Sequence, residues 1–253
     1  MKNANFDNIA GEIANLIKKS SRTCVLTGAG LSTESGIPDF RSPKTGLWNK
    51  YDPMELLATD TLYSNPKLFY TESLKILLPM IEALPNKAHE MLAALEKEGY
   101  IYSLTTQNID NLHYRAGSRK IYEVHGNLRT CHCMQCGRSF DFSIIISKSD
   151  NGEIPPLCNE CGGVLRTDVV LFGDRMPGCF EEAYNDISGS DLLIVIGSSL
   201  QVAPVNMLPQ AARKLVIINI GETSYDRRAD ILYNEKASVA LTNIYAELKK
   251  EEI

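Results

Sequence analysis

The sequence contains no hydrophobic stretch long enough to span a membrane. Apolar runs such as Leu192–Ile196 and Leu215–Ile218 are of strand length, well below the roughly 18 apolar residues that a membrane-spanning helix needs. Near the N-terminus, apolar and polar residues alternate at helical spacing, without the apolar core and cleavage site of a signal peptide. We therefore expect no membrane partner and predict a cytoplasmic protein.

The sequence also has no block of like charges. Its 253 residues carry a formal net charge of −5, and no run of five or six acidic or basic residues occurs. Within residues 139–163, four acidic residues accompany a single basic residue, Lys148. A surface that binds nucleic acid is expected to be basic, so no nucleic-acid partner is predicted.

The composition and the order of the predicted elements favour an α/β fold. Hydrophobic residues make up 44% of the chain and charged residues 23%, which is ordinary for a protein that buries a sizeable core. Short apolar segments alternate with segments of helical periodicity, which is typical of a Rossmann-like, doubly wound parallel sheet. The predicted strands are Thr23–Thr27, Tyr100–Thr105, Leu192–Ile196 and Leu215–Ile220. We expect the loops that follow them to surround one pocket.

Two asparagines predict helix N-termini between the first two strands. Asn65 can cap a helix that has Pro66 at its first position. Asn86 can cap a second helix, which is expected to stop at Gly99. The segment before Asn86 is therefore predicted to be a helical insertion in the α/β domain.

Five of the seven cysteines cluster in one region, which favours a metal site over disulfides. Two Cys-x-x-Cys pairs, each followed by glycine, are separated by 21 residues, a spacing typical of a four-thiolate zinc site. The predicted ligands are Cys133, Cys136, Cys158 and Cys161. Four protein ligands leave zinc no open position, so the expected role is structural. Unpaired buried cysteines are the alternative, whereas a thioredoxin-type redox site needs only one pair.

These features divide the chain into three kinds of segment. We predict a Rossmann-like domain over residues 1–45, 84–128 and 167–253. A cofactor loop and the helical insertion occupy residues 46–83. A zinc-binding module occupies residues 129–166.

The glycine loop after the first strand is only part of a dinucleotide-binding motif. Gly28 and Gly30 match its beginning, but Thr33 stands where the third glycine belongs. A dehydrogenase would also have a second strand ending in an acid about 20 residues on, yet residues 46–52 read as a polar loop. Hydride transfer is therefore disfavoured. The binding of a dinucleotide pyrophosphate by this loop remains compatible with the sequence.

A series of longer motifs is similar to the sirtuin family in its prokaryotic, single-domain form. In chain order they are GAGLSTESGIPDFR (28–41), TQNIDNLH (106–113), HG (125–126), VLFGD (170–174), GSSLQVAP (197–204) and INIGE (218–222). Together with the cysteine pairs, they extend the resemblance from near residue 20 to near residue 235.

The resemblance implies an NAD-dependent protein-lysine deacylase. Such an enzyme cleaves NAD, releases nicotinamide, and forms O-acyl-ADP-ribose and free lysine from an acyl-lysine protein or peptide. It implies NAD as co-substrate and a structural zinc ion. Two other functions remain open at this point: a protein mono-ADP-ribosyltransferase, and a zinc-ribbon binding module on an NAD-sensing scaffold.

The resemblance also assigns roles to individual residues. Catalysis is assigned to His125, as general base, and to Asn108; histidine suits this role because its unperturbed pKa lies near working pH. The implied NAD contacts are Gly28, Ala29, Gly30, Ile37, Phe40, Arg41, Gln107, Asn108, Asp110, Gly197, Ser198, Ser199, Asn219 and Glu222. The implied peptide contacts, made as an added strand, are Val170, Phe172 and Gly173.

Several residues have other interpretations or depart from the family pattern. His89 and His113 lie in predicted helices and are expected to be packing or surface residues. Asp110 can cap the helix that follows it as well as bind a ligand. Asp174 stands where glutamate is usual, and Asn111 where glycine is frequent, which leaves substrate preference in doubt.

The segment that follows the cofactor loop gives an expectation about the acyl group. Sirtuins that prefer succinyl or malonyl lysine resemble one another in having a tyrosine and an arginine there. Residues 66–80 contain Tyr70 but no arginine. A buried carboxylate needs a cationic partner, so we predict a preference for neutral acyl groups, acetyl first.

Overall fold

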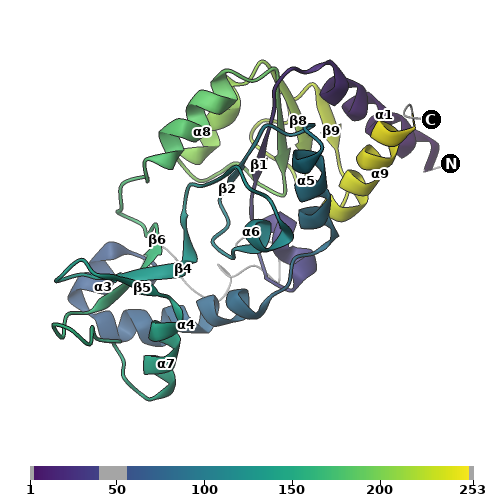
Figure 1. The fold of residues 1–253 in the computed structure, drawn as a ribbon. Coiled ribbons are helices and arrows are strands. Elements are labelled where there is room, and N and C mark those ends of the chain that lie inside the picture. Colours follow the sequence, from purple (N-terminus) through teal and green to yellow (C-terminus); the bar gives the residue numbers. More distant parts are fainter. Residues whose placement is uncertain (1–2, 40–55, 251–253) are drawn as a thin grey trace.

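A computed structural model describes residues 3–39 and 56–250. It consists of a larger part built on a six-stranded parallel sheet and a smaller part built on a three-stranded antiparallel sheet (Figure 1). The α/β fold class predicted from the sequence is confirmed. No helix of the described residues is long and apolar enough to cross a membrane.

The six strands of the larger sheet lie in the order β3-β2-β1-β7-β8-β9, and every pair is parallel. If these strands are renumbered along the chain, leaving out the other sheet, their order is 3-2-1-4-5-6. This is the order of a Rossmann fold, in which the two halves extend to either side of β1. The strands are β1 (Thr23–Thr27), β2 (Ser103–Thr106), β3 (Ile121–Glu123), β7 (Leu192–Ile196), β8 (Lys214–Ile218) and β9 (Ile231–Tyr233).

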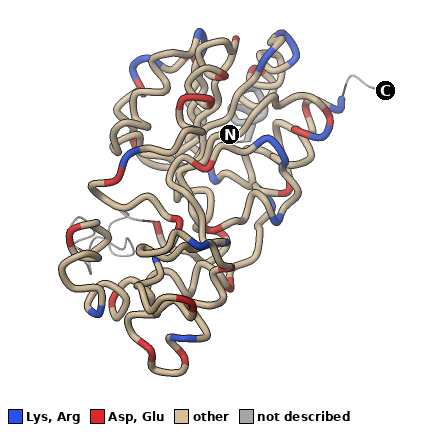
Figure 2. Tube along the Cα trace, turned by 60° about the vertical axis from the view of Figure 1, so that its left-hand side comes forward, with Lys and Arg blue, Asp and Glu red and all other residues tan. Residues whose placement is uncertain are grey.

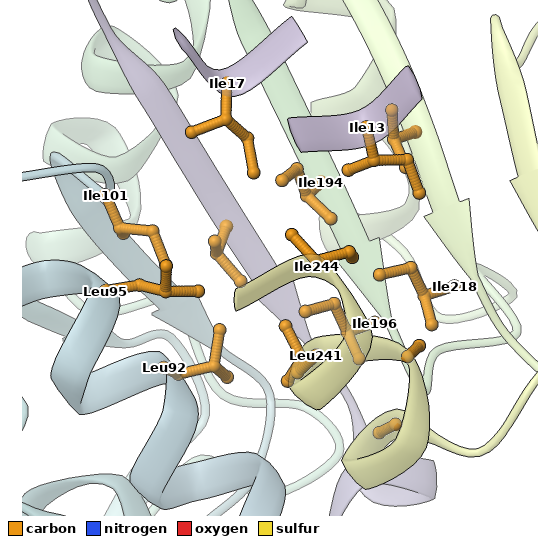
Figure 3. Packing of buried hydrophobic residues seen from close by; sticks show 14 of the residues in the cluster. Ile13, Ile17, Leu92, Leu95, Ile101, Ile194, Ile196, Ile218, Leu241 and Ile244 are labelled. Carbon is orange, nitrogen blue, oxygen red and sulfur yellow. The ribbon is translucent and has the colours of Figure 1, made fainter. Parts of the chain in front are cut away.

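Helices cover both faces of this sheet. One face packs against α1 (Asn3–Lys19), α5 (Lys87–Lys97) and α9 (Ala237–Lys249). Figure 3 shows the side chains between them: Ile13 of α1, Leu92 of α5 and Ile244 of α9 converge on Ile194 and other strand residues. Each fully buried side chain of this kind stabilises the fold by about 1.5–3 kcal/mol.

Alternate side chains of the central strands point to the opposite face of the sheet and pack there against other helices. Leu193 and Val195 point away from Ile194, toward α8 (Cys179–Ser188) and the 3-10 helix η3 (Val205–Ala211). There they pack with Ile187 and Leu208. Because both faces are covered, β1 and β7 are buried at every position; β7 is continuously apolar, and β1 is apolar at its centre with a threonine at each end.

The smaller part has its own core. The antiparallel strands β4 (Gly126–Cys133), β5 (Ser139–Asp141) and β6 (Leu165–Val169) lie in the order β5-β4-β6, beside α7 (Ser143–Asp150), α3 (Thr59–Ser64) and α4 (Pro66–Glu82). Phe69 and Tyr70 of α4 pack against Leu165 and Ile145. The buried Tyr70 hydroxyl donates a hydrogen bond to the Leu165 carbonyl, which joins α4 to β6.

The predicted helix caps are present. The Asn65 side chain accepts a hydrogen bond from the Leu68 amide at 3.1 Å at the start of α4. The Asn86 side chain accepts from the Ala88 amide at 2.9 Å at the start of α5. Both asparagines thus satisfy amides that have no partner inside their helix.

The strand predicted over residues 100–105 begins later than expected. Strand β2 starts at Ser103, because the amides of Tyr100 and Ile101 instead donate to the Leu95 carbonyl, at 2.9 and 3.3 Å, and close the end of α5. The strand predicted to end at Ile220 already ends at Ile218, and Ile220 is exposed.

Acidic and basic residues are interspersed along the described chain (Figure 2). Ion pairs between two exposed side chains, such as Arg213 with Asp191, contribute little to stability.

Candidate functional site

The loops after β1 and β7 interlock where their strands end. The 3-10 helix η1 (Ala29–Ser35) follows β1 directly, and the Gly30 amide donates to the Gly197 carbonyl at 2.8 Å. Gly197 has a φ of +62°, and a Cβ there would lie 2.4 Å from the Leu31 nitrogen. Only glycine allows this approach. The backbone of both loops is therefore held at one edge of the pocket.

Buried polar side chains connect η1 to the loop after β2. The Asn108 side-chain amide donates to the Gly28 carbonyl and to the Ser32 hydroxyl, both at 3.1 Å. The Ser32 hydroxyl donates to the Asp110 carboxylate at 2.6 Å. Burial raises the pKa of Asp110, and hydrogen bonds from Ser32 and the Leu112 amide lower it. Asp110, which was predicted to cap the helix after it, accepts from the amide of Leu112, the first residue of the short helix α6 (Leu112–Ala116), while the N-cap position itself is held by Asn111.

A pocket opens beside these groups. It is lined by residues of the loops after β1, β2 and β7, such as Ala29, Gln107 and Val202, and by residues 169–174. Three of the four loops predicted to surround one pocket therefore do so. Its described lining does not include Asn219 or Glu222 of the fourth loop, after β8.

His125 faces this pocket from the link between β3 and β4. Its Nδ1 lies 3.0 Å from the Gln107 carbonyl oxygen. A carbonyl can only accept, so Nδ1 carries the proton and the Nε2 lone pair is left to act as a base. Burial lowers the pKa of His125, and the hydrogen bond to Gln107 opposes this shift. The imidazole is therefore neutral at physiological pH.

Residues 170–174 form one wall of the pocket next to His125. The Val170 amide donates to the His125 carbonyl at 2.9 Å. The amide and carbonyl of Phe172 pair with Leu57 and Thr59, both at 2.9 Å. Asp174 accepts from the Leu171 amide at 2.7 Å and forms an ion pair with Arg166. The aspartate that replaces the usual glutamate thus fixes the turn of this segment.

The remaining predicted residues fall into three groups. Ile37 lines the pocket, and the Gln107 side chain donates to the Ser198 hydroxyl at 2.8 Å, with Ser199 following in the same loop. The Asn219 side chain donates to the Gly221 carbonyl at 2.7 Å, and Glu222 is exposed. Phe40 and Arg41 lie outside the described residues.

No sequence pattern indicates the apolar part of the pocket. Leu57, Met80, Ile109 and Met176 line it. They come from four different segments, and periodicity within one segment cannot show that they meet.

His89 and His113 are packing residues, as predicted. Both are buried, with ring centroids 4.9 Å apart. His89 accepts from the Asn86 amide at 3.3 Å, and His113 lies 2.9 Å from the Thr27 hydroxyl. Burial lowers the pKa of His89 to about 4.

The four predicted zinc ligands come together in the smaller part. Their sulfur atoms all lie within 4.8 Å of one another, and the Cys133–Cys161 and Cys136–Cys158 separations are 3.4 and 3.9 Å. Sulfurs at the corners of a zinc tetrahedron, with bonds near 2.3 Å, are about 3.8 Å apart, so the cluster fits this ion. The amides of Gln135 and Glu160 point at Cys133 and Cys158, each at 3.4 Å, and stabilise thiolates.

Known proteins resemble the chain over most of its length. The model of the Sir2 family matches residues 28–204. "NAD-dependent protein deacetylase 2" of Caldanaerobacter subterraneus subsp. tengcongensis is 56% identical over 96% of this chain and 97% of that protein. The Thermotoga maritima "NAD-dependent protein deacetylase" is 42% identical over 88% of this chain and 92% of its own.

Solved structures agree with these relatives. A Sir2 variant with deacetylated p53 peptide and 3'-O-acetyl-ADP-ribose superimposes with a TM-score of 0.89, at 40% identity over 93% of this chain and 97% of that one. Sir2 with p53 peptide and NAD+ gives a TM-score of 0.86, at 39% identity and the same coverage. The chain therefore belongs to the Sir2 family, the sirtuins that its motifs resemble.

Proposed function

We propose that this protein is an NAD-dependent protein-lysine deacetylase. The observation that carries the proposal is His125, a neutral imidazole that lines the pocket and whose Nδ1 is held by the Gln107 carbonyl, which leaves Nε2 as the base. The names of the relatives support it, since both curated proteins described above are NAD-dependent protein deacetylases. NAD would supply a sugar carbon that the acyl oxygen of a modified lysine attacks as nicotinamide leaves. A ribose hydroxyl would then attack the acyl carbon, one water from solvent would be consumed, and the products would be nicotinamide, free lysine and O-acyl-ADP-ribose.

The loop residues suit a dinucleotide. Gly28, Gly30 and Gly197 let the loops after β1 and β7 pack closely, which brings both loops to one edge of the pocket, where a pyrophosphate would bind. We assign phosphate contacts to this edge, together with Ala29, Ser198 and Ser199, and to Arg41 outside the described residues. Asn219 and Glu222 are assigned to the adenosine ribose, and Gln107 to the second ribose.

The buried polar cluster suits the nicotinamide end. Asn108 and Asp110 present amide and carboxylate groups that can bind a carboxamide, and Ile37 lies beside them. Phe40 is assigned to the reacting sugar carbon. Asn108 then acts in catalysis by holding the leaving group, and His125 takes the proton from a ribose hydroxyl.

The peptide would bind along residues 170–173. An added strand gains backbone hydrogen bonds and reads little of the side-chain sequence. Because the Phe172 backbone already pairs with Leu57 and Thr59, and the Val170 amide pairs with His125, we expect the peptide to pair with the Val170 carbonyl and with Gly173.

The pocket wall favours a neutral acyl group. Leu57, Met80 and Ile109 are apolar, and the described lining contains no lysine or arginine. Tyr70 is buried, and its hydroxyl is bound to Leu165. We expect kcat/KM at saturating NAD to be highest for acetyl lysine in a peptide series that also carries butyryl, myristoyl and succinyl lysine. Succinyl as the best substrate would contradict this.

The zinc ion is proposed to be structural. Cys133, Cys136, Cys158 and Cys161 would fill all four positions of the ion, which leaves none for a substrate. Thiolate ligands persist in a reducing compartment, which supports a cytoplasmic location. We propose that residues 129–166 form this zinc-binding module, residues 46–83 the cofactor loop and helical insertion, and the rest the NAD-binding domain.

Nicotinamide release tests the proposal. Purified protein is incubated with NAD, with and without an acetyl-lysine peptide, and nicotinamide and deacetylated peptide are quantified. Equal amounts of both, only when the acetylated peptide is present, are expected. Nicotinamide release that instead labels an unacetylated protein with ADP-ribose would favour the mono-ADP-ribosyltransferase.

A further inference from the structure

An arginine outside the pocket joins two of the loops that form it. Arg129 lies on β4, four residues after His125. Its guanidinium donates to both carboxylate oxygens of Glu123, at 2.6 and 2.5 Å, and to the Asn111 side-chain oxygen at 2.8 Å. One rigid group thus contacts two separate segments, which the forked geometry of arginine allows.

The first segment carries the nicotinamide-binding cluster. Asn111 has a left-handed backbone, with a φ of +65°, immediately after Asp110. Asp110 is bonded to Ser32 on one side and to the Leu112 amide on the other. Holding the Asn111 side chain therefore restrains the turn that places the Asp110 carboxylate.

The second segment carries the general base. Glu123 ends β3, two residues before His125, and its carboxylate also accepts from the Asn127 side chain at 3.2 Å. The Asn127 side chain accepts in turn from the Arg129 amide at 3.0 Å. Residues 123–129, which include His125, thus form a loop whose two ends are joined by the Glu123–Arg129 ion pair.

We propose that Arg129 is a positioning residue that sets the His125 turn against the Asp110 turn. The side chain does not line the pocket, so it acts through Glu123 and Asn111 and not on the reacting atoms. General-base catalysis and nicotinamide binding both depend on sub-ångström placement, and Arg129 adds side-chain contacts to a backbone hydrogen bond between these segments, from the Leu128 amide to the Ile109 carbonyl. This inference rests on the proposed function.

Three variants test the positioning role. Arg129→Gln removes both interactions, Arg129→Lys keeps the charge without the fork, and Asn111→Gly removes only the contact with the Asp110 turn. Glycine suits the left-handed backbone at residue 111, so this last variant preserves the fold even where Arg129→Gln does not. Arg213→Gln is the control, because Arg213 makes a similar ion pair, with Asp191, at an exposed position.

We expect Arg129→Gln to lower kcat by about tenfold or more, the effect of losing a charge-assisted hydrogen bond that fixes a catalytic loop. Its KM for the peptide should change little, while inhibition by nicotinamide weakens. Arg129→Lys should recover part of kcat, Asn111→Gly should weaken nicotinamide inhibition alone, and Arg213→Gln should match the wild type. Combining Asn111→Gly with Arg129→Gln should add nothing to Arg129→Gln.

Hydrogen exchange provides a readout that does not depend on activity. Amides of residues 110–112 and 124–126 should exchange faster in Arg129→Gln than in Arg213→Gln. An active wild type, with Arg129→Gln equal to it in kcat, nicotinamide inhibition and exchange, would overturn the role of Arg129 alone. A wild type that released no nicotinamide would overturn the proposed function, and this inference with it.

Discussion

Replacing Gly197 with alanine should damage both the fold and NAD binding. The residue has a φ of +62°, a conformation that costs alanine about 1–2 kcal/mol. The new Cβ would also lie 2.4 Å from the Leu31 nitrogen and 2.7 Å from the Gly30 carbonyl carbon, so backbone must move. Overpacking of this kind costs about 1–3 kcal/mol more. The expected loss of unfolding free energy is about 2–5 kcal/mol.

Gly99→Ala separates the conformational cost of a positive φ from the cost of overpacking. Gly99 has a φ of +82°, and a Cβ there would meet nothing within 4 Å, so this variant bears only the conformational cost. For a protein of this size, each 1 kcal/mol lowers Tm by about 2–4 °C. Gly99→Ala should therefore lower Tm by about 2–8 °C, and Gly197→Ala by clearly more.

The two variants should also differ in enzyme kinetics. A displaced Gly197 moves the Gly30 amide that donates to it, so KM for NAD should rise in Gly197→Ala and stay unchanged in Gly99→Ala. Thermal unfolding and initial rates at varied NAD measure both effects. Equal Tm and equal KM for the two variants would refute the reasoning that the loops interlock through this contact.

Three further variants test other parts of the molecule. Cys158→Ala should reduce zinc from one ion per chain to well below one, because three thiolates remain; full occupancy by metal analysis would contradict the assignment. His125→Ala should lower deacetylation at least about a hundredfold while Tm and NAD binding are kept, the loss typical of a general base; a near-normal rate would remove it from the mechanism. His89 has its pKa lowered by burial from 6.5 to about 4. Because buried His89 binds a proton less readily than in the unfolded chain, its contribution to the free energy of unfolding is complete above pH 6.5. This contribution is lost as pH falls toward 4, by up to about 3 kcal/mol. In urea unfolding at both ends of that range, His89→Gln should lose less stability than the wild type; this comparison cancels the protonation of the zinc thiolates, and equal losses would contradict the shift.

Periodicity and glycine placement predicted much of the fold. Strand β7 lies where its apolar run begins and ends, because both faces of the sheet are covered and no polar position interrupts it; β1 extends the apolar run of residues 24–26 by one buried threonine at each end. Element ends were harder to predict. The amides of Tyr100 and Ile101 cap α5 instead of extending β2, and this competition depends on the geometry of the Leu95 carbonyl.

The site was predictable where spacing determines geometry. The two cysteine pairs meet as expected, since a two-residue gap places both sulfurs of a pair on one ion. The Arg129 contacts could not be predicted in this way. They join Glu123 to Asn111 across separate loops, and only the folded chain brings these loops together.

The strand order has a consequence for how the chain folds during synthesis. Thr23 of β1 pairs with Leu192 of β7. One edge of β1 therefore stays unpaired until β7, far along the chain, has been synthesised. Closing so long a loop costs entropy before any contact repays it, which makes this step slow. Until β7 leaves the ribosome, β1 exposes apolar side chains and an edge of unpaired backbone groups, and this is the segment that a chaperone would be expected to protect.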